Sequence, residues 1–175
     1  RNHLSANNEG GRIPHPQKIG VCIFPQYGRD IGVNWSAWWV ACLRGLKSQH
    51  PDFEIEGFCF HTSLAEEFCE MTRLFKDAGL PVRQVQAPVL DFRSATTALQ
   101  KYGLLISSRF HAVVAANVYE ISNVAIASGN YYSAKMNAAV AGHEAWSRLA
   151  DPATTAPEAL LAFCREALNR SPRGK

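Results

Sequence analysis

The chain has 175 residues, of which 47% are hydrophobic and 19% are charged. This length and composition suit one domain with a buried core, and they exclude a disordered chain. The formal net charge of +3 is carried by Arg170, Arg173 and Lys175, so the rest of the chain is neutral and no basic surface for nucleic acid is expected.

The first segment and the cysteines set the expected organisation. Residues 1–17 contain Asn7-Asn8, Gly10-Gly11, Pro14 and Pro16 without periodicity, which predicts a linker or inter-domain strap. Residues 18–170 are predicted to form a single Rossmann-like domain, followed by a basic tail at 171–175. The five cysteines, without a C-x-x-C pair, favour a reducing compartment and a cytoplasmic location. No apolar run approaches the ~20 residues of a membrane span, and the absence of Met at the start favours a fragment of a longer protein.

Short apolar runs alternate with helical patterns from residue 18. Residues 18–24 (KIGVCIF) form a continuous apolar run before Pro25, which is typical of a buried strand. Residues 35–48 have apolar residues at three- and four-residue spacing, which predicts a helix capped by Asn34. A second strand is predicted at 53–60, a second helix at 63–78 between a Ser63 cap and Gly79, and a short strand at 82–85.

The same alternation continues to the end of the chain. It predicts a helix at 91–101, a strand at 103–107, a helix at 109–119, a strand at 123–127, a helix from about Ser133 and a last helix at 157–168. Strands that alternate with helices indicate a doubly wound parallel sheet, covered on both faces. Ligands in such α/β folds bind beyond the carboxyl ends of the strands, so the loops at those ends are the candidate sites.

The first of these loops lacks the glycine patterns of dinucleotide and P-loop sites. It offers Gln26 and Arg29 as candidate substrate-binding residues, with Arg29 either meeting an anion or lying exposed beside Asp30. The helix that follows carries Trp35, Trp38 and Trp39 at the spacing of a buried face. We expect these indoles in the core, and a partner interface if they prove exposed.

The most informative segment is Ser107-Ser108-Arg109-Phe110-His111, which follows an apolar strand and opens a helix. Ser108 is the predicted N-cap, which places Arg109 and His111 in the first turn. A helix N-terminus attracts anions, so a cation there is unfavourable unless an anion compensates it. Arginine matches a carboxylate or phosphate, and histidine exchanges protons near neutral pH. The alternative is a salt-bridged Arg109 and a histidine satisfied within the core.

Lys135 is a second cation that the pattern places in the first turn of a helix, after Tyr131 and Tyr132. It is expected to approach the same edge of the sheet from the neighbouring strand, or else to be a solvated side chain. The sequence has no His, Cys and carboxylate cluster with the spacing of a metal site.

These segments together resemble the polysaccharide pyruvyltransferase family. The family has an apolar strand, a G/S-x-R-[LF]-H turn, an alanine-rich helix, a further strand and an aromatic-x-x-lysine. Here these elements read LLISSRFHAVVAANV, NVAIAS and Tyr132-Ser133-Ala134-Lys135. The resemblance implies the C-terminal, donor-binding half of a two-Rossmann-domain (GT-B type) transferase, with an N-terminal domain or second chain elsewhere.

The resemblance also implies an activity, which is transfer of the enolpyruvyl group of phosphoenolpyruvate to a sugar hydroxyl, forming a pyruvate ketal in exopolysaccharide or cell wall polysaccharide biosynthesis. His111 is the implied general acid and Arg109 its catalytic partner. Ser107, Ser108, Tyr132 and Lys135 are the implied substrate-binding residues, with phosphoenolpyruvate as donor substrate and no cofactor. Two alternatives stay open: a GT-B glycosyltransferase domain for a nucleotide sugar, and a non-catalytic Rossmann-like interaction module.

Overall fold

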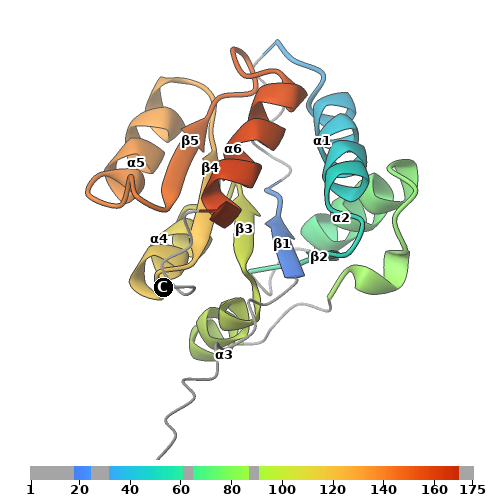
Figure 1. Cartoon of the computed structure of the whole chain (residues 1–175), viewed down its shortest axis with the longest axis horizontal. Coiled ribbons are helices and arrows are strands. Elements are labelled where there is room, and N and C mark those ends of the chain that lie inside the picture. Colours follow the sequence, from blue (N-terminus) through green and yellow to red (C-terminus); the bar gives the residue numbers. More distant parts are fainter. Residues whose placement is uncertain (1–17, 25–31, 61–64, 87–90, 170–175) are drawn as a thin grey trace, which may run out of the picture.

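A computed structural model describes residues 18–24, 32–60, 65–86 and 91–169. Five parallel strands form one sheet in the order β2-β1-β3-β4-β5 (Figure 1). The strands are β1 (Lys18–Cys22), β2 (Glu54–Gly57), β3 (Leu104–Ser107), β4 (Ser122–Ile126) and β5 (Ser147–Ala150). The predicted doubly wound α/β architecture is therefore confirmed.

Side chains alternate between the two faces of the sheet, as strand geometry requires. Ile19, Val21 and Ile23 pack under α1 (Trp35–Gln49), α2 (Ala65–Asp77) and α6 (Pro157–Asn169). Of these helices, α1 and α6 lie side by side (Figure 1). The opposite face is covered by α3 (Phe92–Ala98), α4 (Phe110–Val118) and α5 (Asn130–Val140). Both faces are thus closed to water.

The helix that carries the tryptophans lies in the core, as its spacing predicts. Trp35, Trp38 and Trp39 are at most 6% exposed, and the side chain of Asn34 caps the helix by accepting the N–H of Ala37 at 3.0 Å. The expectation of a tryptophan interface, which required exposure, is therefore wrong. The five cysteines form no disulfide.

The structure corrects two predicted elements. Residues 82–85 are not a strand: Val82–Gln84 form a 3-10 helix, η2, and Val85 makes a single bridge to Gly57. Strand β5 is missing from the prediction because Ser147-Arg148-Leu149-Ala150 lacks the β-branched run that marks a strand.

Helix ends also differ from the prediction. Gly79, at φ 75°, ends the turn after α2 as expected. The predicted 91–101 helix is α3 followed by a 3-10 turn, η3 (Leu99–Lys101), and α5 begins at Asn130, directly after Gly129 at φ 79°. The linker at 1–17, the basic tail at 171–175 and the Ser63 cap lie outside the described residues and stay predictions. In the part of the chain that the structure describes, no helix is long and apolar enough to cross a membrane.

Candidate functional site

The strand order reverses between the neighbouring strands β1 and β3, which is the topological switch point of the sheet. The chain leaves β1 towards α1 on one face of the sheet, and it leaves β3 towards α4 on the other. Connections that diverge in this way open a crevice at the carboxyl ends of the two strands, where doubly wound proteins bind ligands. The segment after β3 is the predicted Ser107–His111 site, so topology and motif indicate the same place.

The two serines of this segment hold the strand ends together. The hydroxyl of Ser108 accepts the backbone N–H of Phe24 at 2.7 Å, and the N–H of Ser108 donates to the carbonyl of Cys22 at 2.9 Å. The hydroxyl of Ser107 accepts the N–H of Arg109 at 2.9 Å. Ser108 is therefore not the N-cap of α4; that position belongs to Arg109, because the Ser108 hydroxyl is used across the strands.

Arg109 forms an ion pair with Glu67, a carboxylate in the first turn of α2 that is 1% exposed. Its guanidinium also lies over the ring of Phe24, 3.9 Å from the centroid. The compensating anion that the sequence implied is thus supplied by the protein itself. Sequence reasoning missed Glu67, because nothing local marks it as different from Glu66 beside it.

His111 differs from Arg109 in exposure. It is the second residue of α4 and its side chain is exposed, with its ring 5.5 Å from that of Phe110 in an edge contact. The expectation of a satisfied core histidine is therefore wrong. An exposed imidazole in the first turn of a helix can meet an anion that approaches the helix N-terminus.

Lys135 is joined to the same segment through Phe110. Its Nζ lies 4.4 Å from the centroid of the Phe110 ring, a cation–π contact between α5 and α4. Because α5 begins at Asn130, Lys135 lies in the second turn and not the first. Tyr132, 37% exposed, packs edge-on against Tyr131 at 5.1 Å. The structure thus brings Lys135 to α4, whereas Gln26 and Arg29 lie outside the described residues.

Two thiols lie near Arg109, and both are neutral. Burial raises the pKa of Cys22 to about 12 and that of Cys59 to about 11, while Arg109 pulls both values down. A thiol with so high a pKa is not a nucleophile at pH 7. In the part of the chain that the structure describes, no three His, Cys, Asp or Glu side chains are grouped to hold a metal ion. Beside these neutral thiols, the described part of this edge holds two cations, Arg109 and Lys135, and the imidazole of His111.

The sequence matches no protein-family model and no curated protein. Its fold is similar to that in a crystal structure of the glycotransferase of kitacinnamycin, with a TM-score of 0.53 and 12% sequence identity. The likeness covers 99% of this chain but only 41% of the other. The chain therefore has a glycosyltransferase-like α/β fold and spans less than half the length of that neighbour.

Proposed function

We propose that this chain is the donor-binding half of a GT-B type transferase whose donor carries a phosphate group. The observation that carries the proposal is an exposed histidine at a helix N-terminus beyond the carboxyl end of β3, with a lysine packed on the adjacent Phe110, in a fold like that of a glycosyltransferase. The wall of the cleft that binds the acceptor would come from another domain or chain.

A nucleotide sugar is the first candidate donor. Its diphosphate would lie at the N-terminus of α4, where unpaired N–H groups and the helix dipole favour negative charge. When the bond from the anomeric carbon to the diphosphate breaks and the acceptor oxygen bonds to that carbon, charge develops on the leaving phosphate. His111 would donate a hydrogen bond to it, and Lys135 would add positive charge.

Phosphoenolpyruvate is the second candidate, favoured by one contact. The Arg-Phe-His turn and the Tyr-x-x-Lys segment, which together carry the pyruvyltransferase resemblance, meet where Lys135 lies over Phe110. His111 would protonate the methylene carbon, a sugar hydroxyl would attack the adjacent carbon, and the carbon–oxygen bond to phosphate would break. A second hydroxyl would then close the ketal, and the protons lost by the two hydroxyls would go to the now neutral His111 and to the released phosphate. Because the charge of Arg109 is already paired with Glu67, Arg109 would offer less positive charge to the donor phosphate than Lys135.

The test is a thermal-shift series with UDP, CMP, their sugars and phosphoenolpyruvate. A ligand at 100 times its Kd stabilises the native state by ~2.7 kcal/mol, and each kcal/mol raises the melting temperature of a chain of this size by ~2–4 °C. We expect one donor class to give such a shift. His111→Ala is expected to reduce the shift, and the melting temperature of the free variant, measured alongside, separates this loss of binding from any change in stability.

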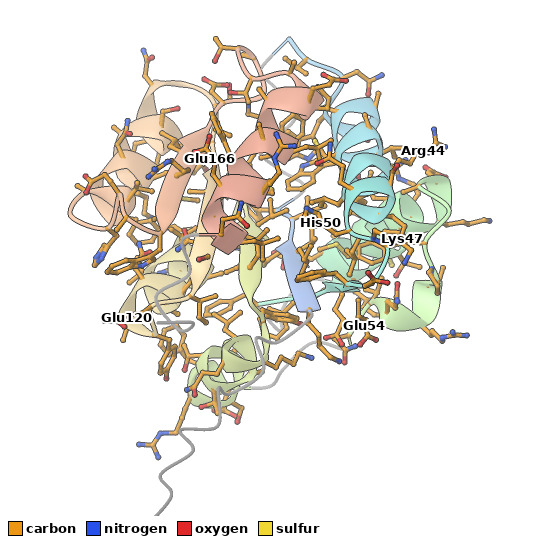
Figure 2. The ribbon with its side chains drawn as sticks, in the orientation of Figure 1. Arg44, Lys47, His50, Glu54, Glu120 and Glu166 are labelled. Atoms are coloured by element: carbon orange, nitrogen blue, oxygen red, sulfur yellow. The ribbon has the colours of Figure 1, made fainter. Side chains whose placement is uncertain are left out.

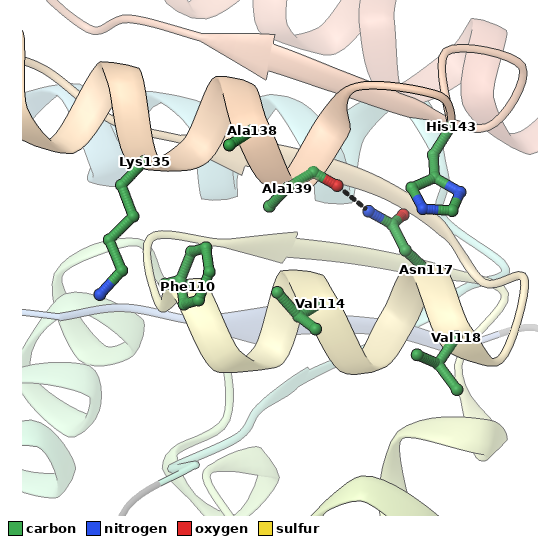
Figure 3. Close-up of a pocket in the computed structure, with 8 residues that line it drawn as sticks. All are labelled: Phe110, Val114, Asn117, Val118, Lys135, Ala138, Ala139 and His143. Carbon is green, nitrogen blue, oxygen red and sulfur yellow. Dashed lines mark hydrogen bonds between the residues drawn. The ribbon is translucent and has the colours of Figure 1, made fainter.

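His143→Ala is the matched control, because His143 follows the carboxyl end of α5, away from Lys135 and Phe110 (Figure 3). It is expected to keep the ligand response. If no phosphorylated donor shifts the melting temperature, or if His111→Ala responds like the unchanged chain, the proposed site is wrong. A shift with phosphoenolpyruvate alone would favour pyruvyl transfer, and a shift with a nucleotide would favour glycosyl transfer.

A further inference from the structure

The two helical layers differ sharply in charge. Helices α1, α2 and α6 carry eleven charged residues of both signs. Helices α3, α4 and α5 carry no acidic residue and, besides His111, only two basic ones, Arg93 and Lys135. A solvated surface is normally rich in charge, whereas the centre of a protein interface is depleted of it. The layer that contains α4 thus has the composition of an interface.

Exposed apolar side chains gather on this same layer. Phe92 on α3 is 63% exposed, and Val114 and Val118, one turn apart on α4, are 38% and 73% exposed. We call Phe92, Val114, Val118 and Ala138 the α4 face. Figure 2 shows, for comparison, Arg44 and Lys47 on α1 and Glu166 on α6 of the other layer.

Val114 and Val118 form a ridge along α4, which we call the valine ridge, and a groove lies on each side of it. The first, about 330 Å³, lies between α4 and α5 and includes Phe110, Val114, Val118, Ala138 and Ala139 (Figure 3). The amide of Asn117, which donates to the carbonyl of Ala139 at 2.6 Å, holds its two walls together. The second, about 240 Å³, lies between α3 and α4 and is lined by Phe92, Val114, Val118 and Tyr119 among others.

We propose that the α4 face binds a second copy of this chain, with α4 packed antiparallel on α4 of the partner about a two-fold axis. A two-fold interface must be self-complementary, and a ridge flanked by grooves satisfies this requirement, because each Val118 can enter the groove between α4 and α5 of the other copy. The exposed residues Ala134, Asn137 and Ala138 of α5 are small, so the helices can approach closely.

The charges at the two ends of α4 favour the antiparallel arrangement. Glu120 is exposed directly beyond the carboxyl end of α4, while His111 and Lys135 lie at its amino end. Antiparallel pairing places Glu120 of each copy against the basic end of the other, and it also opposes the two helix dipoles. A parallel arrangement would instead bring like charges together. This inference does not depend on the proposed transferase function.

Sedimentation equilibrium of the full chain without ligand tests the pairing. Over roughly 10 µM to 1 mM, the range in which a weak interface becomes populated, we expect the mass to rise towards twice that of one chain. Val118→Glu, which puts a charge on the ridge, is expected to weaken the dimer by at least about tenfold. Val82→Glu is the matched control, because Val82 is also an exposed valine, 41% accessible, but lies in η2; it should leave the dimer unchanged.

A charge exchange tests the orientation. Glu120→Lys and Lys135→Glu are each expected to weaken the dimer, and the double variant is expected to regain most of the loss. A monomer at all concentrations, or a dimer that Val118→Glu leaves intact, would overturn the proposal. Losses that add in the double variant would overturn the antiparallel pairing.

Discussion

Arg109 shows how one buried partner changes the meaning of a site residue. Its charge is balanced by Glu67, which is almost wholly buried. Breaking a buried ion pair on one side leaves an uncompensated charge and costs about 3–5 kcal/mol, whereas replacing both partners by apolar groups is often close to neutral. The first consequence of removing Arg109 is therefore a loss of stability.

We expect Arg109→Met to lower the free energy of unfolding by about 3–5 kcal/mol, and the Glu67→Met/Arg109→Met double variant to recover much of it. Urea unfolding of the four proteins in this cycle measures the coupling. Additive losses would show that the two side chains do not stabilise each other. His111 is the better probe of ligand binding, because its side chain is exposed, whereas Arg109 is paired with the buried Glu67.

The local sequence predicts only part of the candidate site. The placement of Arg109 and His111 at the start of a helix follows from an apolar strand that ends in a polar turn. The hydrogen bond from the N–H of Phe24 to the Ser108 hydroxyl cannot be predicted in this way, because it joins segments that are 84 residues apart in the sequence. The same holds for Glu67 and Arg109, whose pairing depends on how α2 packs beside the ends of the strands.

At the scale of elements, periodicity predicts long helices and buried strands well. Helices α1 and α6 are found within a residue or two of their predicted bounds, since each has a complete apolar face. The short elements fail for physical reasons. Strand β5 is held by pairing with β4, and its middle residues Arg148 and Leu149 are only half-buried. Residues 82–85 have apolar ends but only one ladder bridge to hold them as a strand.

Glu56 ties three elements together at the start of the sheet. This carboxylate of β2, 3% exposed, accepts from Lys18 of β1 at 2.6 Å and from Tyr102 beside η3 at 3.1 Å, and it pairs with Lys101 at 2.5 Å. Burial pushes the pKa of Glu56 up, but the hydrogen bonds from Lys101 and Lys18 outweigh it, so the pKa lies below its ordinary value of 4.5.

A pKa lowered by folding gives stability that is fully present above pH 4.5 and is lost as the pH falls through the folded-state value. We expect Glu56→Gln to be less stable than the unchanged chain at about pH 7 and to lose less stability on acidification to about pH 3. Urea unfolding of both proteins at both pH values measures how much the free energy of unfolding of each falls with pH, which is its slope. Equal slopes for the variant and the unchanged chain would mean that Glu56 does not contribute to the acid sensitivity.

At the scale of the whole molecule, the sheet sets a gradient of local stability. Strands β1, β3 and β4 have hydrogen-bonded neighbours on both sides and lie between two helical layers, whereas β2 and β5 lie at the edges. We expect the amides of Val21, Leu105 and Ile106 to exchange with deuterium most slowly, with an opening free energy close to that of global unfolding, and those of β5 to exchange faster. Native-state hydrogen exchange by NMR checks this order, and β5 amides as slow as those of β3 would contradict it.

The architecture of the whole molecule follows from the sequence more fully than its surface does. Strand and helix alternation is enough to predict a doubly wound sheet, because few topologies bury such a pattern. The α4 face is not predicted, since Val114 and Val118 in the apolar FHAVVAANV segment have the pattern of a core helix. Only the placement of α4 against the sheet shows which of its apolar residues remain outside.

The pairing of β1 with β3 has a consequence for how this protein is made. Ile19 pairs with Leu104, so β1, the first of the five described strands to be synthesised, obtains β3 as its neighbour only after a further 85 residues have been added. At about 5–20 residues per second, this interval lasts roughly 4–17 seconds. Once β2 has been made and paired with β1, the edge of β1 that later pairs with β3 is still open, which invites aggregation until β3 emerges to close it.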